Sequence, residues 1–341
     1  MLAYSYSQYG SADVVSRIEV PTPIAKPDEV LIRVVATTVS AGDWRARSLT
    51  MPKGLGFVGR LVFGLTGPRK PILGTEFSGI IEKVGSDVST FQAGDAVIGF
   101  PGASFGAHAE FITMPADGKL TKKPDTVSFA EAAAIPFGGT TAFDFLVNKA
   151  KLKSGDRILI NGASGSVGSA SVQIAKHLGA KVTAVCSGKN TDLVQKLGAD
   201  RVIDYRTESI VEHGVQYDMV IDTVGTLPWS QAQHAIRAGG KMVLIAGKTS
   251  DMLLGALKAH HKGKKMIGGV ATESREILEA VVDLAEQGIL RPVIDRRYAF
   301  DDMRAAHAHV DTGRKKGNVV VAVMPEVSAE IAMNTKDLVN V

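Results

Sequence analysis

One stretch constrains the fold of this chain more than any other: residues 157–181, RILINGASGSVGSASVQIAKHLGAK. An apolar run is followed by Gly162, Gly165 and Gly168, and the chain then takes on the apolar spacing of a helix. A strand, a glycine turn and a helix in this order bring backbone N–H groups and the positive end of a helix to an anion such as a pyrophosphate. We therefore expect a dinucleotide to bind this turn, with the two serine hydroxyls as further donors, at Gly162, Ser164, Gly165, Ser166, Val167 and Gly168.

The glycine spacing alone leaves a second interpretation open. It is G-x-x-G-x-x-G, whereas the dinucleotide fingerprint is G-x-G-x-x-G, so the glycines could serve packing only. The rest of the chain favours the dinucleotide, because apolar runs alternate with helical segments, at 158–160, 182–185, 202–203, 219–224 and 242–245. This alternation predicts an α/β fold with a doubly wound parallel sheet. The glycine turn follows its first strand, where such sheets bind nucleotides.

The segments on either side of this sheet have other patterns. Residues 1 to about 125 contain short β-branched runs separated by turn signals, which predicts a compact β domain. Ser128, with Glu131 at the capping-box position, predicts the start of a helix, and a second helix is expected after Gly138 and Gly139. Toward the end of the chain we expect a helix at 276–287, strands at 289–298 and 318–324, and a partly disordered tail at 325–341.

Composition excludes several classes of protein. A net charge of +4 over 341 residues does not favour a nucleic-acid partner, and the basic run at 258–265 is expected to be a solvated loop. The single cysteine, Cys186, excludes an intramolecular disulfide and a multi-cysteine zinc site, and it fits a reducing, cytoplasmic location. No secretory leader is visible at the start. Residues 54–67 are apolar but too short to span a bilayer, so we expect a loop near the active site, with peripheral membrane contact as the alternative.

The end of the second predicted strand indicates which cofactor binds. An NAD site places an acidic residue there for the ribose 2′-hydroxyl, but no Asp or Glu occurs between Asp156 and Asp192. Ser187 as a donor and Lys189 as a cation favour a 2′-phosphate instead, which predicts NADPH; the alternative is that Lys189 is an ordinary surface lysine. The ends of the fourth and fifth strands should line the same crevice, at Val224, Ala246 and Gly247, although glycines there could simply begin turns.

Several segments together resemble the medium-chain dehydrogenase/reductase superfamily, and within it the zinc-free quinone oxidoreductase, zeta-crystallin-like branch. They are Gly74-Thr75-Glu76, Gly94 to Val97, Ala109 to Phe111, the glycine turn, Asp204 to Arg206, Asp222 to Gly225 and Gly288 to Asp295. The resemblance implies a GroES-like β domain formed by residues 1–126 and 266–324, and a Rossmann domain between them at 127–265. It also implies an active-site cleft at the junction and a homodimer.

The chain departs from the zinc alcohol dehydrogenases of that superfamily. A cysteine that precedes an aspartate by three residues in those enzymes is here Ser40, before Asp43, and their Gly-His-Glu is Gly74-Thr75-Glu76. The four cysteines of a structural zinc lobe are also missing, so we expect no metal. By family position Ser40 and Thr141 are expected beside the nicotinamide, Tyr205 beside the 2′-phosphate and Asn318 near the cofactor. Arg45 stands where quinone oxidoreductases often have a tyrosine, so no proton donor is assigned.

These observations predict an NADPH-dependent reductase of quinones or α,β-unsaturated carbonyl compounds that works by hydride transfer without zinc. The protein would contribute proximity, orientation and hydrogen bonds to a developing oxyanion, and no catalytic residue is assigned. The enzyme alternative is a zinc-independent carbonyl or alcohol oxidoreductase. The alternative of another class is a noncatalytic NADPH-binding protein of the crystallin type.

Overall fold

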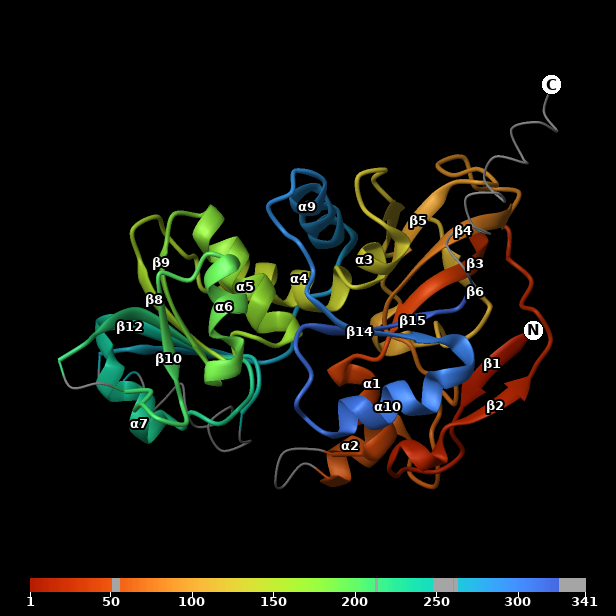
Figure 1. Cartoon of the computed structure of the whole chain (residues 1–341). Helices are drawn as coiled ribbons and strands as arrows, with labels where there is room; N and C mark the ends of the chain where they lie inside the picture. Colours follow the sequence, from red (N-terminus) through yellow and green to blue (C-terminus); the bar gives the residue numbers. More distant parts are fainter. Residues whose placement is uncertain (51–55, 212–213, 248–259, 261–262, 325–341) are drawn as a thin grey trace.

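The computed structural model describes residues 1–50, 56–211, 214–247, 260 and 263–324. The expected tail at 325–341 and most of the basic run at 258–265 lie outside these residues. The described chain forms two lobes, one around a parallel sheet and one around a mainly antiparallel sheet (Figure 1).

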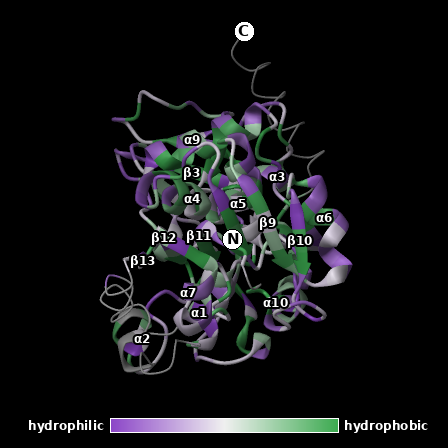
Figure 2. Ribbon diagram, turned by 90° about the vertical axis from the view of Figure 1, so that its left-hand side faces the viewer, coloured by the Kyte–Doolittle hydropathy of each residue, from purple (hydrophilic) through white to green (hydrophobic). Residues whose placement is uncertain are grey.

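The parallel lobe contains the predicted doubly wound sheet. Its strand order is β10-β9-β8-β11-β12-β13, and every neighbouring pair is parallel. The strands are β8 (Arg157–Asn161), β9 (Lys181–Cys186), β10 (Arg201–Asp204), β11 (Tyr217–Asp222), β12 (Ile236–Leu244) and β13 (Lys265–Gly268). Side chains from both faces of the sheet are buried, which is why its strands are nearly continuous apolar runs. Figure 2 shows the contrast between these hydrophobic strands and the hydrophilic outer turns.

The helices of this lobe pack into its hydrophobic core. They are α4 (Pro136–Phe143), which continues as the π-helix Asp144–Lys149, α5 (Ser166–His177), α6 (Thr191–Lys196), α7 (Trp229–Ala235) and α9 (Arg275–Glu286), with a short 3₁₀ turn at Gly188–Asn190. The face of α5 that carries Val172, Ile174 and Ala175 is fully buried against the sheet. No helix among the described residues is long and apolar enough to cross a membrane.

The second lobe is built from both ends of the chain, as the resemblance implies. Its sheet order is β14-β15-β3-β4-β5-β7, with β6 paired to β3. The strands are β3 (Glu29–Thr38), β4 (Phe77–Val84), β5 (Ala96–Gly99), β6 (Phe111–Pro115), β7 (Leu120–Lys122), β14 (Ile294–Ala299) and β15 (Asn318–Ala322), beside the hairpin β1 (Leu2–Ser5) and β2 (Ser16–Glu19). The late strand β15 pairs antiparallel with the early strand β3, with Val320 opposite Thr38. The predicted fold class is therefore confirmed.

Short helices complete the second lobe. They are α1 (Ala41–Ser48), α2 (Gly56–Phe63), α3 (Phe129–Ala133), α10 (Met303–Asp311) and the 3₁₀ turns Ala12–Val14, Gly102–Ser104 and Phe300–Asp302. Ser128 and Glu131 form the predicted capping box at the start of α3. The expectation of a loop at 54–67 was wrong in part, because 56–63 form α2. Arg60 of this helix donates to the Leu65 carbonyl at 3.0 Å, in the turn that follows the helix.

Three further expectations need correction. Gly138 and Gly139 lie inside α4, not before it, because a Cβ at Gly138 would lie 2.5 Å from Ser166 Oγ of α5 and the two helices pack too closely for a side chain. The described residues between β10 and β11 form turns and no helix. The parallel sheet also continues past the expected boundary at residue 265, because β13 pairs with β12 and α9 packs into the core of this lobe.

Candidate active site

The glycine turn after β8 has the geometry that a dinucleotide site needs. Gly162 has φ +80, and a Cβ there would lie 2.5 Å from Thr223 Oγ1. A Cβ at Gly168 would lie 2.1 Å from the Gly162 carbonyl oxygen. The helix α5 can therefore lie this close to the turn only because residue 168 is a glycine. Gly165 is the N-cap of α5 and provides no side-chain cap, so the first N–H groups of the helix remain available to an anion.

We predict that Gly168→Ala lowers the free energy of unfolding by about 1–3 kcal/mol, as expected when a side chain is forced into a packed site. The same variant should bind NADPH more weakly, because the turn must move. The matched control is Gly165→Ser, since a Cβ there has no neighbour closer than 3.5 Å and serine is a good N-cap. Chemical denaturation of both variants checks the prediction, and equal stability losses would contradict it.

Two buried polar atoms near the turn have no partner in the described part of the chain: Ser166 Oγ and Asn190 Oδ1. The Asn190 Nδ2 group donates to Ser164 Oγ at 3.0 Å, which leaves that hydroxyl free to donate in turn. Buried polar groups are normally paired. The open donors and acceptors around the turn therefore fit a polar ligand such as a dinucleotide.

The carboxyl ends of five parallel strands, β8 to β12, bring most of the predicted residues to one edge of the sheet. Val224 touches the glycine turn, since a Cβ at Gly162 would lie 2.7 Å from its Cγ1. Gly225 lies against Ala246 and Gly247, and Tyr205 and Val224 are both half exposed. Val224 follows the end of β11 and is not part of a strand.

The Asp222 carboxylate organises this edge. It is fully buried and accepts the N–H groups of Val224, Gly225 and Leu227 and the Asn161 side-chain amide, at 2.9–3.1 Å. Burial raises the pKa of Asp222, and these four hydrogen bonds oppose the increase. The carboxylate therefore fixes the turn after β11 against the end of β8.

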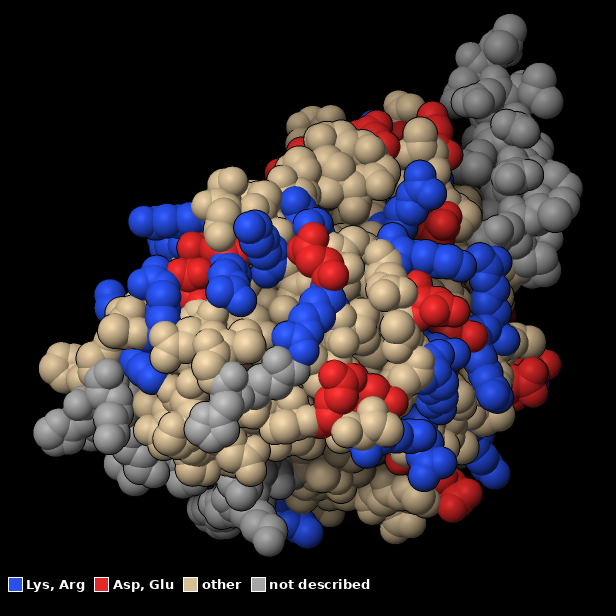
Figure 3. Space-filling view, turned by 60° about the vertical axis from the view of Figure 1, so that its left-hand side comes forward, with Lys and Arg blue, Asp and Glu red and all other residues tan. Residues whose placement is uncertain are grey.

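Lys189 lies in a groove that is richer in basic residues than the sequence predicted. Ser187 is buried at the end of β9, and Lys189 is exposed two residues later. The groove is lined by Lys189, Asp295, Arg296, His309, Thr312, Arg314 and Lys316. Sequence reasoning missed the three further cations, because they come from β14 and the turn before β15. Figure 3 shows that basic side chains form groups on the face that it presents.

The expected nicotinamide neighbours lie on two helices that meet at the junction of the lobes. Ser40 is the N-cap of α1, and its hydroxyl donates to Asp43 at 2.7 Å. Thr75 donates to Ser40 Oγ at 2.9 Å. Thr141 lies one turn after Phe137 in α4, and a Cβ at Gly42 would touch both Thr75 and Phe137 at 3.2–3.3 Å. Ser40 and Thr141 are therefore brought to the same junction.

Ser40 and Thr75 stand where the zinc enzymes have two of their metal ligands, and the hydroxyl groups of these two residues are hydrogen-bonded to each other. Within the described ranges, no three His, Cys, Asp or Glu side chains come close enough together to hold a metal ion. His307 is fully buried, and neither of its ring nitrogens has a hydrogen-bond partner among the residues that the structure describes. Burial lowers the pKa of His307 well below its usual value, so this side chain is neutral.

The late turn before β15 reaches the glycine turn. The Gly317 N–H donates to the Ser164 carbonyl at 2.8 Å, and Gly165 and Gly317 form a parallel bridge. Asn318 is buried beside this bridge and donates to the Val293 carbonyl at 3.1 Å. The turn before β15 therefore contacts the glycine turn directly, across the two lobes.

Glu76 lies at the junction of the lobes, and the sequence did not indicate that its pKa is shifted. Glu76 is fully buried, and it accepts from Thr38 Oγ1 at 2.5 Å and from the Phe137 N–H at 2.6 Å. Burial raises the pKa of Glu76 to about 8, although both hydrogen bonds and the Lys315 charge favour the ionised form. No local sequence signal distinguishes a buried from an exposed glutamate at this position.

Comparison with known proteins agrees with this architecture. The family model described as alcohol dehydrogenase GroES-like domain matches residues 26–125, and the one described as zinc-binding dehydrogenase matches residues 197–321. The chain is 33% identical to the 2-methylene-furan-3-one reductase of Solanum lycopersicum, over 95% of this chain and 80% of that one. It is also 33% identical to the chloroplast envelope quinone oxidoreductase homolog of Arabidopsis thaliana, over 94% of this chain and 98% of that one.

Among solved structures, the Escherichia coli quinone oxidoreductase complexed with NADPH has a TM-score of 0.79 and 25% identity, and the match covers 94% of this chain and 100% of that one. Fold and matches together define an oxidoreductase. The chain belongs to the medium-chain dehydrogenase/reductase superfamily, in the branch that contains the quinone oxidoreductases. The resemblance inferred from the sequence segments is confirmed.

Proposed function

We propose that this protein is an NADPH-dependent reductase of quinones or α,β-unsaturated carbonyl compounds. The observation that carries the cofactor choice is the basic groove around Lys189, with Arg296, Arg314 and Lys316 along its wall. Four cations along one groove suit a 2′-phosphate and would gain little from a 2′-hydroxyl. Relatives named as a quinone oxidoreductase homolog and as a reductase of a methylene-furanone support the substrate class.

Each part of the site has a distinct role in this proposal. NADPH supplies the hydride when it is bound. The N–H groups of the glycine turn bind its pyrophosphate, Lys189 and Tyr205 bind the 2′-phosphate end, and Val224, Ala246 and Gly247 border the crevice. Ser40, Thr75 and Thr141 lie at the reacting end, where hydroxyl groups orient a substrate oxygen by hydrogen bonds.

We further propose that no metal takes part. The hydroxyls of Ser40 and Thr75 replace two ligands of the zinc enzymes and are hydrogen-bonded to each other. Stoichiometric zinc in purified protein after gel filtration would contradict this proposal.

Homodimer formation and a cytoplasmic location belong to the same proposal. β13 is the last strand of the parallel sheet and has one edge without a partner in the described residues, so a second copy could pair there. A single buried cysteine, whose pKa burial raises to about 11, suits a reducing compartment. Gel filtration with light scattering tests the assembly, and a monomer would contradict it.

The decisive experiment is NADPH oxidation, followed by absorbance, with a panel of quinones, alkenals and alkenones. We expect turnover with at least one of these acceptors and none with saturated aldehydes or with simple alcohols and NADP⁺. Tight NADPH binding without turnover on any acceptor would favour the noncatalytic alternative. Turnover only with saturated carbonyls or alcohols would favour the carbonyl and alcohol oxidoreductase.

A further inference from the structure

Lys315 lies in the turn between α10 and β15, two residues before Gly317, which contacts the glycine turn of the other lobe. The Lys315 Nζ donates to the Gly317 carbonyl at 2.5 Å. The Gly317 N–H donates to the Ser164 carbonyl, and Gly317 also bridges to Gly165. A single residue, Gly317, therefore connects the ammonium to the backbone that we expect to bind a pyrophosphate.

The ammonium has no counter-ion among the described side chains. It carries three N–H donors, but the Gly317 carbonyl is its one acceptor within the described ranges. Two carboxylates lie near enough to favour its charged form, but each is bonded elsewhere. Glu76 is held by Thr38 and by the Phe137 N–H, and Asp295 lies 2.8 Å from His309 Nε2. Lys315 is only partly buried, so its two remaining donors are open to an anion from outside the chain, and a charge-assisted hydrogen bond would hold that anion there.

We propose that Lys315 binds the pyrophosphate of the dinucleotide and that this contact makes cofactor binding depend on a proton. The inference rests on the proposed cofactor site, but it concerns a different part of the ligand. Lys189, Arg314 and Lys316 line the groove for the 2′-phosphate, which NADH lacks. The pyrophosphate is common to NADH and NADPH, so Lys315 should matter equally for both.

The charges around Lys315 set the pH range of this effect. Burial lowers the pKa of Lys315 to about 8, and Glu76 and Asp295 oppose that change. Arg314 and Lys316 flank Lys315 in the turn. Burial raises the pKa of Glu76 to about 8, and the Glu76 carboxyl and the Lys315 ammonium each favour the charged form of the other, so the two groups titrate together.

The sign of the pH effect follows from linkage. A bound pyrophosphate favours the charged ammonium and raises its pKa, so near pH 8 the complex holds a proton that part of the free protein has lost. Binding therefore takes up a proton, and affinity falls as the pH rises through about 8. The 2′-phosphate does not titrate in this range, because its second pKa is about 6.

The test measures dissociation constants of NADPH and NADH by fluorescence titration between pH 7 and 9 at fixed ionic strength, with calorimetry in two buffers to count protons. For the native chain we expect both affinities to fall about tenfold between pH 7 and 9, as one proton with a pKa near 8 predicts. Lys315→Met should weaken both cofactors about tenfold at pH 7 and remove the pH dependence, as loss of one charged hydrogen bond implies. Lys315→Arg should keep the affinity and also lose the pH dependence, because arginine does not titrate here.

The neighbouring residue provides the matched control. Lys316→Met should weaken NADPH alone and keep the pH dependence. The inference is overturned if Lys315→Met affects NADPH but not NADH, if both Lys315 variants keep the native pH dependence, or if Glu76→Gln alone removes it. If the native chain binds neither cofactor, the proposed function fails instead. Circular dichroism of each variant confirms that the fold is retained.

Discussion

Replacing Lys189 with glutamate is expected to raise the KM for NADPH about 100-fold, because a hydrogen bond to a charged group contributes about 1.5–3 kcal/mol and each 1.4 kcal/mol is a factor of ten. The KM for NADH should change by no more than about threefold, since its 2′-hydroxyl carries no charge for the new carboxylate to repel. Steady-state kinetics with both cofactors and one active quinone or alkenone measure the ratio.

A matched control separates this effect from a general change in surface charge. Lys196 is exposed at the end of α6, in the same lobe, and does not line the basic groove. Lys196→Glu should leave the KM for both cofactors within about twofold, because Lys196 does not line the groove and an exposed charge acts only weakly through water and salt. If Lys189→Glu raises the KM for NADPH and for NADH equally, the groove does not bind the 2′-phosphate, and the proposed preference for NADPH loses its basis.

The features predicted correctly from the sequence are those that depend on local chain geometry. The order of strand, glycines and helix at 157–177 determines a turn whose shape needs few distant residues. The capping box at Ser128 is equally local. For the same reason the absence of an acidic residue after β9 could be read directly from the chain.

The features that the sequence did not predict depend on how segments far apart in the chain come together in the fold. Arg314 and Lys316 join Lys189 only because β15 pairs with β3 and carries the preceding turn across to the other lobe. The helix expected between β10 and β11 was inferred from alternation alone. Ile210, Val211 and Val215 pack against the core there, but the described residues of the segment form turns.

The contact between the lobes has a consequence for cofactor binding. The Gly317 N–H bonds to Ser164, so the turn that carries Lys315 and Lys316 is fixed on the glycine turn itself. The two phosphate regions proposed here thus share one structural element from the C-terminal part of the chain. A substitution in that turn should therefore alter cofactor affinity even when the substituted residue does not contact the substrate.

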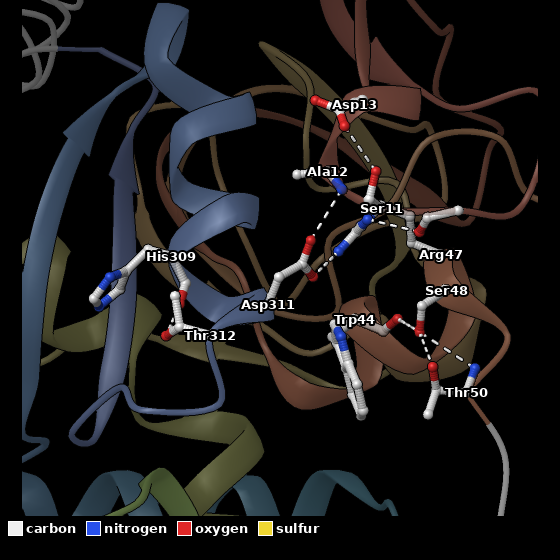
Figure 4. A network of polar contacts seen from close by, with 11 residues as sticks. Ser11, Ala12, Asp13, Trp44, Arg47, Ser48, Thr50, His309, Asp311 and Thr312 are labelled. Atoms are coloured by element: carbon white, nitrogen blue, oxygen red, sulfur yellow. Dashed lines mark hydrogen bonds and ion pairs between the residues drawn. The ribbon is translucent and has the colours of Figure 1, made fainter.

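The second large effect concerns an ion pair in which the arginine is fully buried and the aspartate is partly exposed. Arg47 of α1 is fully buried and pairs with Asp311 at the end of α10 (Figure 4). Arg47 also donates to the Gly10 carbonyl at 2.8 Å, and Asp311 accepts the Ala12 N–H at 2.9 Å. The pair therefore joins the N-terminal segment to helices from both ends of the chain.

Asp311→Ala is expected to lower the free energy of unfolding by about 3–5 kcal/mol, because it leaves a buried guanidinium without its carboxylate. Urea denaturation followed by fluorescence measures the change. The control is Asp301→Ala, since Asp301 forms an exposed pair with Arg17 at 3.0 Å, and such pairs contribute about 1 kcal/mol or less. Adding Arg47→Met to Asp311→Ala should recover part of the loss, because no unpaired charge then stays buried. Equal losses for Asp311→Ala and Asp301→Ala, or a double variant less stable than Asp311→Ala, would show that the buried charge is not the cause.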